Sequence, residues 1–295
     1  MTSRVPILLY HSVSADTAPR FKRWAVRPET FAAHMAYLRR RRYTAVTVTH
    51  LVEAIVDPTV QLPERPVVIT FDDGLADFYS DAFPVLVEHG FASTLYITTG
   101  FVGHTSRWLS PLGEGARPML TWSRIAEIQA GGVECGAHTV SHPQLDIIPR
   151  AAARDEITRC KSRLEQRLGR SVETFAYPSG YYTGALHRFV REAGYRSACG
   201  VKHAMSTTTD DRFALARIMV IDTGDSSLED FAGLIVGRDL PIAPTRRRLG
   251  TRGWRLVRRA TALLEGRPYA VTKNYVAKET DNVEAVADQT FADQA

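Results

Sequence analysis

Two adjacent carboxylates follow a short apolar stretch of this sequence. The run from Val67 to Phe71 is apolar or β-branched, and Asp72 and Asp73 come directly after it. Such a run predicts a buried strand, and the next residue, Gly74, lets the chain turn sharply. Adjacent strand residues point to opposite sides, so only one carboxylate points into a barrel unless the turn twists the second inward. The alternative is that the pair caps a following helix, since Asp is a favoured cap residue.

Two histidines follow a second predicted strand. His138 and His142 come after the predicted strand at 132–137. Histidines four residues apart fall on one face of a helical turn, a spacing suited to a single metal ion. Two neutral imidazoles and one carboxylate make a three-ligand site with an open position for water. The alternative is a pair of cap or surface histidines, but two such motifs, each at the end of a predicted strand, favour a metal site.

These motifs resemble those of a known enzyme family. Thr70 to Gly74 and His138 to His142 are similar to the first two motifs of the polysaccharide deacetylases, carbohydrate esterase family four. The opening Pro6 to Val13 resembles the subgroup that acts on poly-N-acetylglucosamine and related exopolysaccharides, and the likeness covers roughly residues 4 to 236. It implies an α/β fold, a distorted seven-stranded parallel (β/α) barrel.

The resemblance also implies roles for these side chains. In the family the first Asp, here Asp72, is the general base. The second, Asp73, binds one divalent metal ion, usually zinc, together with the two histidines, His138 and His142. The metal polarises the acetyl carbonyl and lowers the pKa of bound water.

A third stretch, 174–182, resembles the motif that builds one side of the cleft. This resemblance implies that Tyr177 and Pro178 help to bind the substrate. By position, the backbone N–H of Ser179 helps to bind the oxyanion, a role that needs no particular side chain. Two departures matter: the family's usual Arg, which orients the base, is Ala176 here, and the family's usual aromatic residue is Ser179. We therefore expect the base to lack its usual partner.

The residue that protonates the departing amine is the least determined by the sequence. The family's usual Leu-x-His motif is missing, because residues 213–236 contain no histidine. His11 follows the first predicted strand, which lies beside the last strand if the barrel closes, and the subgroup supplies its acid from this position. We expect His11 to be the acid, with His203 as the next candidate. His187 lies inside a predicted helix, where a surface role is expected.

Strand and helix patterns alternate along the chain. We count about seven strand–helix units, which implies a parallel sheet with right-handed crossovers. Ala151 to Leu168 is a predicted helix that Gly169 ends. Phe78 to His89 is another, with Asp77 as its cap. The residues with chemical potential all come just after strands, where barrel enzymes place their sites.

The charge divides the chain into a barrel of residues 1–244 and a tail. The whole chain carries +5, whereas residues 245–273 hold nine Lys or Arg and one acid, a net charge of +8. Residues 274–295 carry −4 and are expected to be disordered. Because the high pI comes from the tail, it does not argue for nucleic acid. The basic segment is either packed on the barrel, solvated, or a peripheral membrane contact. All motifs precede it, so we expect the barrel to fold without it.

Cysteine usage and the N-terminus suggest the compartment. Cys135, Cys160 and Cys199 show no pairing pattern, which favours reduced thiols. The apolar run Val5 to Tyr10 is shorter than the core of a signal peptide, and no run approaches the roughly 18 apolar residues of a membrane span. We expect a cytoplasmic protein.

Together these features predict a metal-dependent hydrolase that removes acetyl groups from N-acetylated sugars. Its partner would be a glycan, whether polysaccharide, oligosaccharide or lipid-linked. Two alternatives stay open: a related metal hydrolase of a non-sugar amide, and a non-catalytic glycan-binding barrel. Intact metal ligands and Asp72 argue against the last of these.

Overall fold

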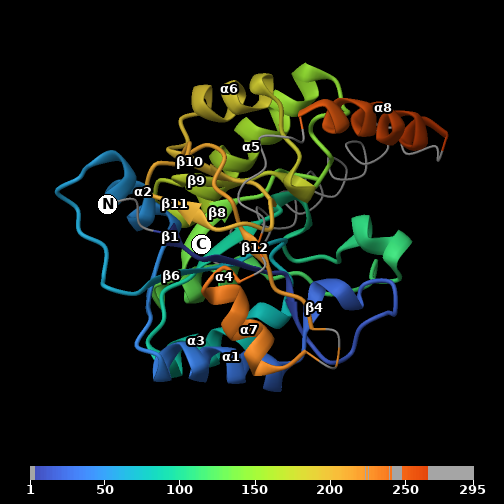
Figure 1. Ribbon diagram of the computed structural model, residues 1–295. Helices are drawn as coiled ribbons and strands as arrows, with labels where there is room; N and C mark the ends of the chain where they lie inside the picture. Colours follow the sequence, from blue (N-terminus) through green and yellow to red (C-terminus); the bar gives the residue numbers. More distant parts are fainter. Residues whose placement is uncertain (1–3, 223, 225, 239, 241–247, 265–295) are drawn as a thin grey trace, which may run out of the picture.

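A curled parallel sheet forms the centre of the fold (Figure 1). The computed structural model describes residues 4–222, 224, 226–238, 240 and 248–264. Seven strands lie in the order β10-β9-β8-β7-β6-β2-β12, all pairings are parallel, and an eighth strand, β5, pairs with the beginning of β6. The predicted α/β class with a seven-stranded barrel-like sheet is therefore confirmed. The strands are β2 (Ile7–Tyr10), β5 (Thr44–Val46), β6 (Pro66–Phe71), β7 (Thr94–Ile97), β8 (Glu134–Ala137), β9 (Thr174–Ala176), β10 (Ser197–Cys199) and β12 (Ile218–Met219).

The chain before β12 brings the two ends of this sheet together. Gly200 N–H donates to the Leu215 carbonyl, and Leu215 N–H donates to the Ala198 carbonyl. β12 itself pairs with β2, so the first strand lies beside the last as expected. Two short pairs lie outside this sheet: β1 (Arg4–Val5) with β11 (Ser206–Thr207), and β3 (Ser12–Val13) with β4 (Ala25–Val26).

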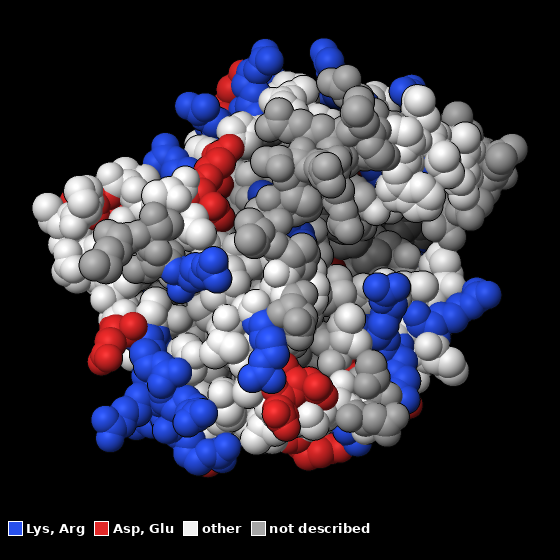
Figure 2. All heavy atoms as spheres, in the orientation of Figure 1, with Lys and Arg blue, Asp and Glu red and all other residues white. Residues whose placement is uncertain are grey.

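Helices surround the curled sheet on its outer side. In Figure 1, α1, α3 and α7 lie below it, whereas α5 and α6 lie above it with α8 beside them. Figure 2 shows basic side chains gathered at the lower left, over the end of α1, where residues 39–42 are exposed. The helices are α1 (Pro28–Arg40), α2 (Val48–Val56), α3 (Phe83–His89), α4 (Trp122–Ala130), α5 (Arg150–Leu168), α6 (Gly184–Glu192), α7 (Leu228–Ile235) and α8 (Arg248–Leu264).

Alternation along β6 separates the barrel interior from the helix layer. Ile69 and Phe71 belong to the large apolar cluster that packs against the helices. Val68 belongs to a smaller cluster with inward residues of the other strands. Since every second residue shares a face, Thr70 and Asp72 continue the Val68 side and point into the barrel.

Asp77 does not cap the helix that follows it, contrary to our prediction. Its carboxylate makes no side-chain cap bond. It accepts hydrogen bonds from Ser12 Oγ at 2.6 Å and Arg117 at 3.1 Å instead. Through Asp77, these bonds tie β3 to the loop that precedes α4. The predicted helix from Phe78 to His89 is present, but its first part, Phe78–Ala82, is π-helical and only Phe83–His89 is α-helical.

The described part of the basic segment forms α8. The predicted boundary near residue 244, the rest of 245–273 and the acidic stretch 274–295 lie outside the described residues. Among the residues that the structure describes, no helix is both long enough and apolar enough to cross a membrane.

Candidate active site

A tight turn aims both carboxylates at the end of β6 into the barrel. Asp72 points inward by strand alternation. Asp73 would then point outward, but its φ of 77° reverses the chain, and Gly74 N–H donates to the Asp72 carbonyl at 3.0 Å. Positive φ at a non-glycine residue is uncommon and strained, and such positions cluster at functional sites. The turn therefore twists Asp73 inward, which is the condition under which both carboxylates can point into the barrel.

The two histidines follow β8 in a loop and not in a helical turn. Thr139 and His142 both have positive φ, 69° and 57°, which folds the chain back so that His142 returns toward His138. His142 N–H donates to Thr139 Oγ1 at 3.0 Å. The helical-face explanation for the spacing was therefore wrong, although the residues do come together.

A buried carboxylate on α5 holds this loop. Glu156 accepts hydrogen bonds from the N–H groups of Val140 and Ser141, each at 2.8 Å, and from Ser141 Oγ at 2.7 Å. Three donors on one carboxylate fix the backbone between the two histidines. Sequence inspection assigned Glu156 only to a helix, because nothing in its neighbourhood along the chain marks this contact.

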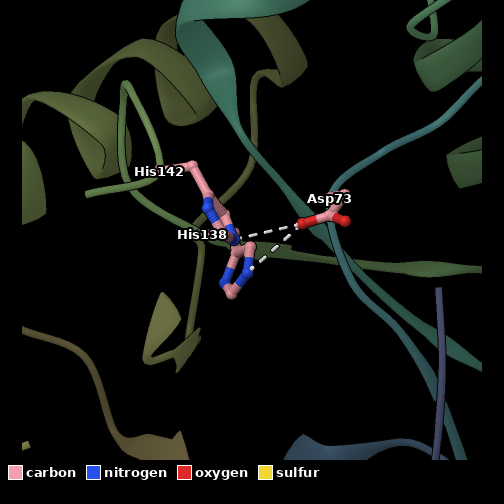
Figure 3. A group of neighbouring side chains, drawn as sticks. All are labelled: Asp73, His138 and His142. Atoms are coloured by element: carbon pink, nitrogen blue, oxygen red, sulfur yellow. Dashed lines mark ion pairs between the residues drawn. The ribbon is translucent and has the colours of Figure 1, made fainter. Parts of the chain in front are cut away.

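Asp73, His138 and His142 form a compact set of potential ligands (Figure 3). Their ligand atoms lie within 4.8 Å of one another. Asp73 Oδ1 lies 3.6 Å from His138 Nε2 and 3.3 Å from His142 Nε2. That oxygen is buried and has no hydrogen-bond partner, which is costly unless something else binds there. One carboxylate and two imidazoles suit a divalent ion such as zinc, so the residues fit the expected metal.

The environment prepares these groups as ligands. His138 Nδ1 lies 2.8 Å from the Ala176 carbonyl, and a proton on Nδ1 leaves Nε2 free to face Asp73. Burial lowers the pKa of His138 to about 4, which keeps its imidazole neutral. Burial alone would raise the pKa of Asp73, but His142 and the other nearby imidazoles hold it below its usual range.

Asp72 is paired with a buried arginine that sequence analysis did not assign. Arg217 donates from both terminal nitrogens to the two Asp72 oxygens, at 2.6 and 2.7 Å. Ala176 stands at the motif position where the family carries its arginine. A guanidinium from the segment before β12 pairs with Asp72 instead, so our expectation of an unpartnered base was wrong. The available signal was a lone cation inside the apolar run 213–220.

Arg217 is itself fixed on every side. Its side chain is fully buried. Its Nε donates to the Gly200 carbonyl at 3.1 Å, and one terminal nitrogen also donates to Thr70 Oγ1 at 3.2 Å. Burial alone would raise the pKa of Asp72, but Arg217 and then His138 outweigh it and hold that pKa below its ordinary value. Asp72 is therefore ionised at neutral pH.

His11 lies beside this group, at the end of β2. β2 is flanked by β6 and β12, and Asp72 N–H donates to the Tyr10 carbonyl. Burial lowers the pKa of His11, while Asp73 and Asp72 raise it, so both carboxylates are close enough to act on the imidazole. The other candidates lie elsewhere: His203 is exposed, and His187 pairs with Asp211 on the surface of α6.

The third motif forms a strained turn after β9. Tyr177 and Pro178 are buried, and the Tyr177 hydroxyl donates to the Phe213 carbonyl at 3.2 Å, so that hydroxyl is already bonded within the protein. Ser179 is exposed and has a φ of 57°. Gly180 permits a close approach, because a Cβ there would lie 2.5 Å from the Val201 nitrogen.

Trp108 covers one side of the histidines. Its ring stacks on His142 with centroids 5.3 Å apart and packs on Phe101 at 4.7 Å. The indole Nε1 is buried without a partner. The sequence showed only a tryptophan in a long loop, and nothing there indicates which side chain it meets.

Comparisons with known proteins agree with this geometry. The family model described as polysaccharide deacetylase matches residues 59–198. YxkH of Bacillus subtilis (strain 168), which carries the polysaccharide deacetylase name, is 25% identical over 218 residues, 74% of this chain and 72% of the relative. The poly-beta-1,6-N-acetyl-D-glucosamine N-deacetylase of Escherichia coli (strain K12) is 35% identical over 77 residues, 26% of this chain and 11% of that protein.

The fold has a solved counterpart as well. The deacetylase PplD of Streptococcus pyogenes, solved in complex with acetate, superposes with a TM-score of 0.68 at 23% identity and covers 80% of this chain and 99% of its own. The motifs, the family model and the relatives agree: the chain is a hydrolase similar to the polysaccharide deacetylases, which act on carbon–nitrogen bonds other than peptide bonds.

Proposed function

We propose that this protein removes N-acetyl groups from an N-acetylated glycan with the help of one divalent ion, preferentially zinc, bound by Asp73, His138 and His142. One observation carries the proposal: the buried, unbonded Asp73 Oδ1 faces two imidazole nitrogens, next to a carboxylate that is ion-paired and kept ionised. When bound, such an ion polarises the acetyl carbonyl and makes water a better nucleophile at neutral pH.

Asp72 is suited to take the proton of the attacking water. Both of its oxygens accept from Arg217, which fixes the plane of the carboxylate, and Oδ2 also lies 3.9 Å from His138 Nε2. An acceptor held in one orientation loses little entropy when the reaction occurs. The exposed turn at Ser179 offers a backbone N–H for the oxyanion.

His11 is suited to protonate the departing amine. An amide nitrogen leaves poorly unless it gains a proton, so this step needs a positioned acid. His11 lies at the same end of the barrel as Asp72, on the neighbouring strand. Burial lowers the pKa of its imidazole, and Asp73 and Asp72 oppose part of that lowering. Asp72 and His11 thus give the site a separate base and acid.

The curated relatives support a sugar substrate. One of them is named for poly-beta-1,6-N-acetyl-D-glucosamine, although it matches over only 77 residues. The test is to purify the protein, measure its metal content, and assay acetate release from N-acetylglucosamine oligomers and from simple amides. Acetate from the oligomers is expected. Release from non-sugar amides alone, or binding without turnover by the metal-loaded protein, would contradict the proposal and favour one of the two alternatives.

A further inference from the structure

α8 docks on the two loops that follow β8 and β9, although it lies far outside the matched family segment. We call these loops the His142 loop (residues 138–148) and the Ser179 loop (residues 177–183). The first carries two candidate metal ligands and the second carries the exposed Ser179 turn. Figure 2 shows the surface hollowed just below the position that α8 occupies in Figure 1.

Arg258 anchors the helix to the His142 loop. Its two terminal nitrogens donate to the Asp146 oxygens at 2.9 and 2.5 Å, and one of them also donates to Gln144 Oε1 at 2.8 Å. Arg255 adds a bond from Nε to the Asp146 carbonyl at 2.7 Å. Arg258 and Asp146 are both buried. A buried, two-point ion pair of this kind fixes orientation as well as contact.

The same helix holds the Ser179 loop through Tyr181. The Arg258 guanidinium lies 3.6 Å from the centroid of the Tyr181 ring, and Trp254 Nε1–H donates to the Tyr181 hydroxyl at 3.2 Å. Trp254 is nevertheless 53% exposed. Its hydrogen bond sets the orientation of an indole that still presents much of its surface to solvent.

We propose that α8 completes the substrate site by presenting Trp254, beside Tyr181, as a stacking wall for a neighbouring sugar ring of the glycan chain. The proposal rests on the proposed deacetylase function. Tyr181 follows Ser179 by two residues, which span at most about 7 Å, so this wall lies next to the catalytic loops. The C–H face of a pyranose is apolar, and an indole offers a broad apolar face with a polar edge that is bonded here to protein.

A membrane-facing role for the helix is the competing interpretation. Leu256 and Val257 are exposed at 69% and 51% beside basic residues, a pattern that also suits an anionic surface. Two of those cations, Arg255 and Arg258, are bonded to the His142 loop and not free for lipid. The docking of α8 next to the catalytic loops therefore favours contact with a glycan over contact with a membrane.

The test compares Trp254→Ala, Trp254→Phe and the control Leu256→Ala, an exposed apolar residue of the same helix. The readout is the ratio of kcat/KM for a pentamer of N-acetylglucosamine to that for a dimer. We expect Trp254→Ala to lower this ratio about tenfold, the scale of one lost aromatic contact. Trp254→Phe should keep most of the ratio because it keeps a ring, and Leu256→Ala should match the wild type.

Metal content and melting temperature are the controls, and each is measured for every variant. Values equal to wild type mean that the fold and the metal ligands are intact. A pentamer-to-dimer ratio within about twofold of wild type in Trp254→Ala overturns the proposal. The proposal is also overturned if Trp254→Ala loses binding to anionic phospholipid vesicles while its pentamer-to-dimer ratio stays unchanged. That result would mean that the exposed face of α8 contacts a membrane.

Failure of the proposed function is recognised separately, because wild-type protein would then release no acetate from either oligomer. In that case the stacking wall is still tested by calorimetric titration of the pentamer into wild type and into Trp254→Ala. Binding weakened about tenfold by the substitution supports the wall. Equal binding, or none to wild type, overturns it.

Discussion

At the scale of single residues, the arrangement of Asp72 depends on one guanidinium. Arg217 is fully buried and donates to Asp72, Thr70 and the Gly200 carbonyl. A buried ion pair is weak evidence for stability, but removing one partner leaves an uncompensated charge. Arg217 is therefore best understood as a positioning residue, which fixes where the carboxylate points and keeps it ionised.

Replacing Arg217 tests this assignment. Arg217→Met should lower kcat by about 10² or more, the size of a general-base contribution, while bound metal stays near wild type. Arg217→Lys, which keeps the charge but loses the two-point geometry, should restore part of kcat. The measurements are kcat, KM and metal content. A parallel loss of metal in both variants would mean that Arg217 only supports the fold.

Asp72 and Asp73 should respond differently to the same change. Asp72→Asn should retain metal and lose most turnover, because an amide cannot take a proton from water. Asp73→Asn should weaken metal binding, since it removes a charged ligand. Metal titration with each purified variant, together with acetate release, separates the two roles, and reversed phenotypes would show that the assignments are exchanged.

His11→Ala should distinguish amides from esters. Without an acid the departing nitrogen is not protonated and is a poor leaving group. Turnover of an acetylated amine should therefore fall about 10²-fold or more. An activated aryl ester needs no proton on its leaving group and should be affected much less. Metal content serves as the control. If turnover of the amide and of the ester falls by the same factor, His11 is not the general acid, and His203 is the next residue to test.

The sequence predicted which residues meet in the site but not how the backbone brings them there. Two Asp and two His at the ends of parallel strands must lie at the same edge of the sheet. Their directions depend on left-handed residues at Asp73, Thr139 and His142. Such conformations are uncommon for residues other than glycine and leave no clear sequence signal, so strand alternation alone would have left Asp73 outside.

At the scale of elements, helix ends were predictable where cap residues mark them. Gly169 ends α5 with a φ of 64°, and Thr121 begins α4 by accepting from Arg124 N–H. The helix predicted from Phe78 was less regular. Pro84 has no N–H to donate to residue 80, and the preceding turn is π-helical. The proline was visible in the interior of the predicted helix, where it removes a hydrogen bond, and in the structure it stands in the first turn of α3.

A buried histidine joins two of these helices. His34 on α1 stacks on Phe231 of α7, with ring centroids 3.8 Å apart, and its Nδ1 lies 3.1 Å from the Tyr10 hydroxyl. Burial lowers the pKa of His34 to about 4, against the opposing effect of Asp222. The folded state therefore binds this proton less readily than the unfolded chain.

The packing of His34 predicts a pH dependence of stability. Its contribution is complete above the unfolded pKa of 6.5 and is lost as pH falls toward about 4. The slope is roughly 1.4 kcal/mol per pH unit within that window. In His34→Gln this slope should disappear. Urea unfolding of both proteins between these pH values measures the difference, and a constant difference at every pH would disprove the assignment.

At the scale of the whole molecule, the site draws on more of the chain than the matched family segment. Residues 59–198 contain the two Asp and the two His of the candidate metal site. His11 precedes this segment, whereas Arg217 and α8 follow it. Sequence analysis found His11 through its place after the first strand. The pairing of Arg217 was missed, and packing of the basic segment on the barrel was only one of three alternatives, because both contacts join parts of the chain that no local pattern connects.

Metal binding should stabilise the whole fold. An ion that binds only the folded state adds about 2.7 kcal/mol when its concentration is 100 times its Kd. For a domain of this size that raises Tm by roughly 5–10 °C. Calorimetry with zinc and after chelation gives the shift. His138→Ala is the matched control and should show little of it, while an equal shift in that variant would place the stabilising ion elsewhere.

The pairing of Asp72 with Arg217 also has a consequence for biosynthesis. The two residues are separated by 145 positions, so a ribosome adding about 5–20 residues per second needs roughly 7–30 s to supply the second after the first. During that interval β6 can pair with β2, but its buried carboxylate has no counter-charge. A nascent or prematurely terminated chain therefore cannot assemble the catalytic arrangement. Hydrolytic activity would therefore arise only after the last strand, β12, has been synthesised. A chain that shows activity must have completed its barrel.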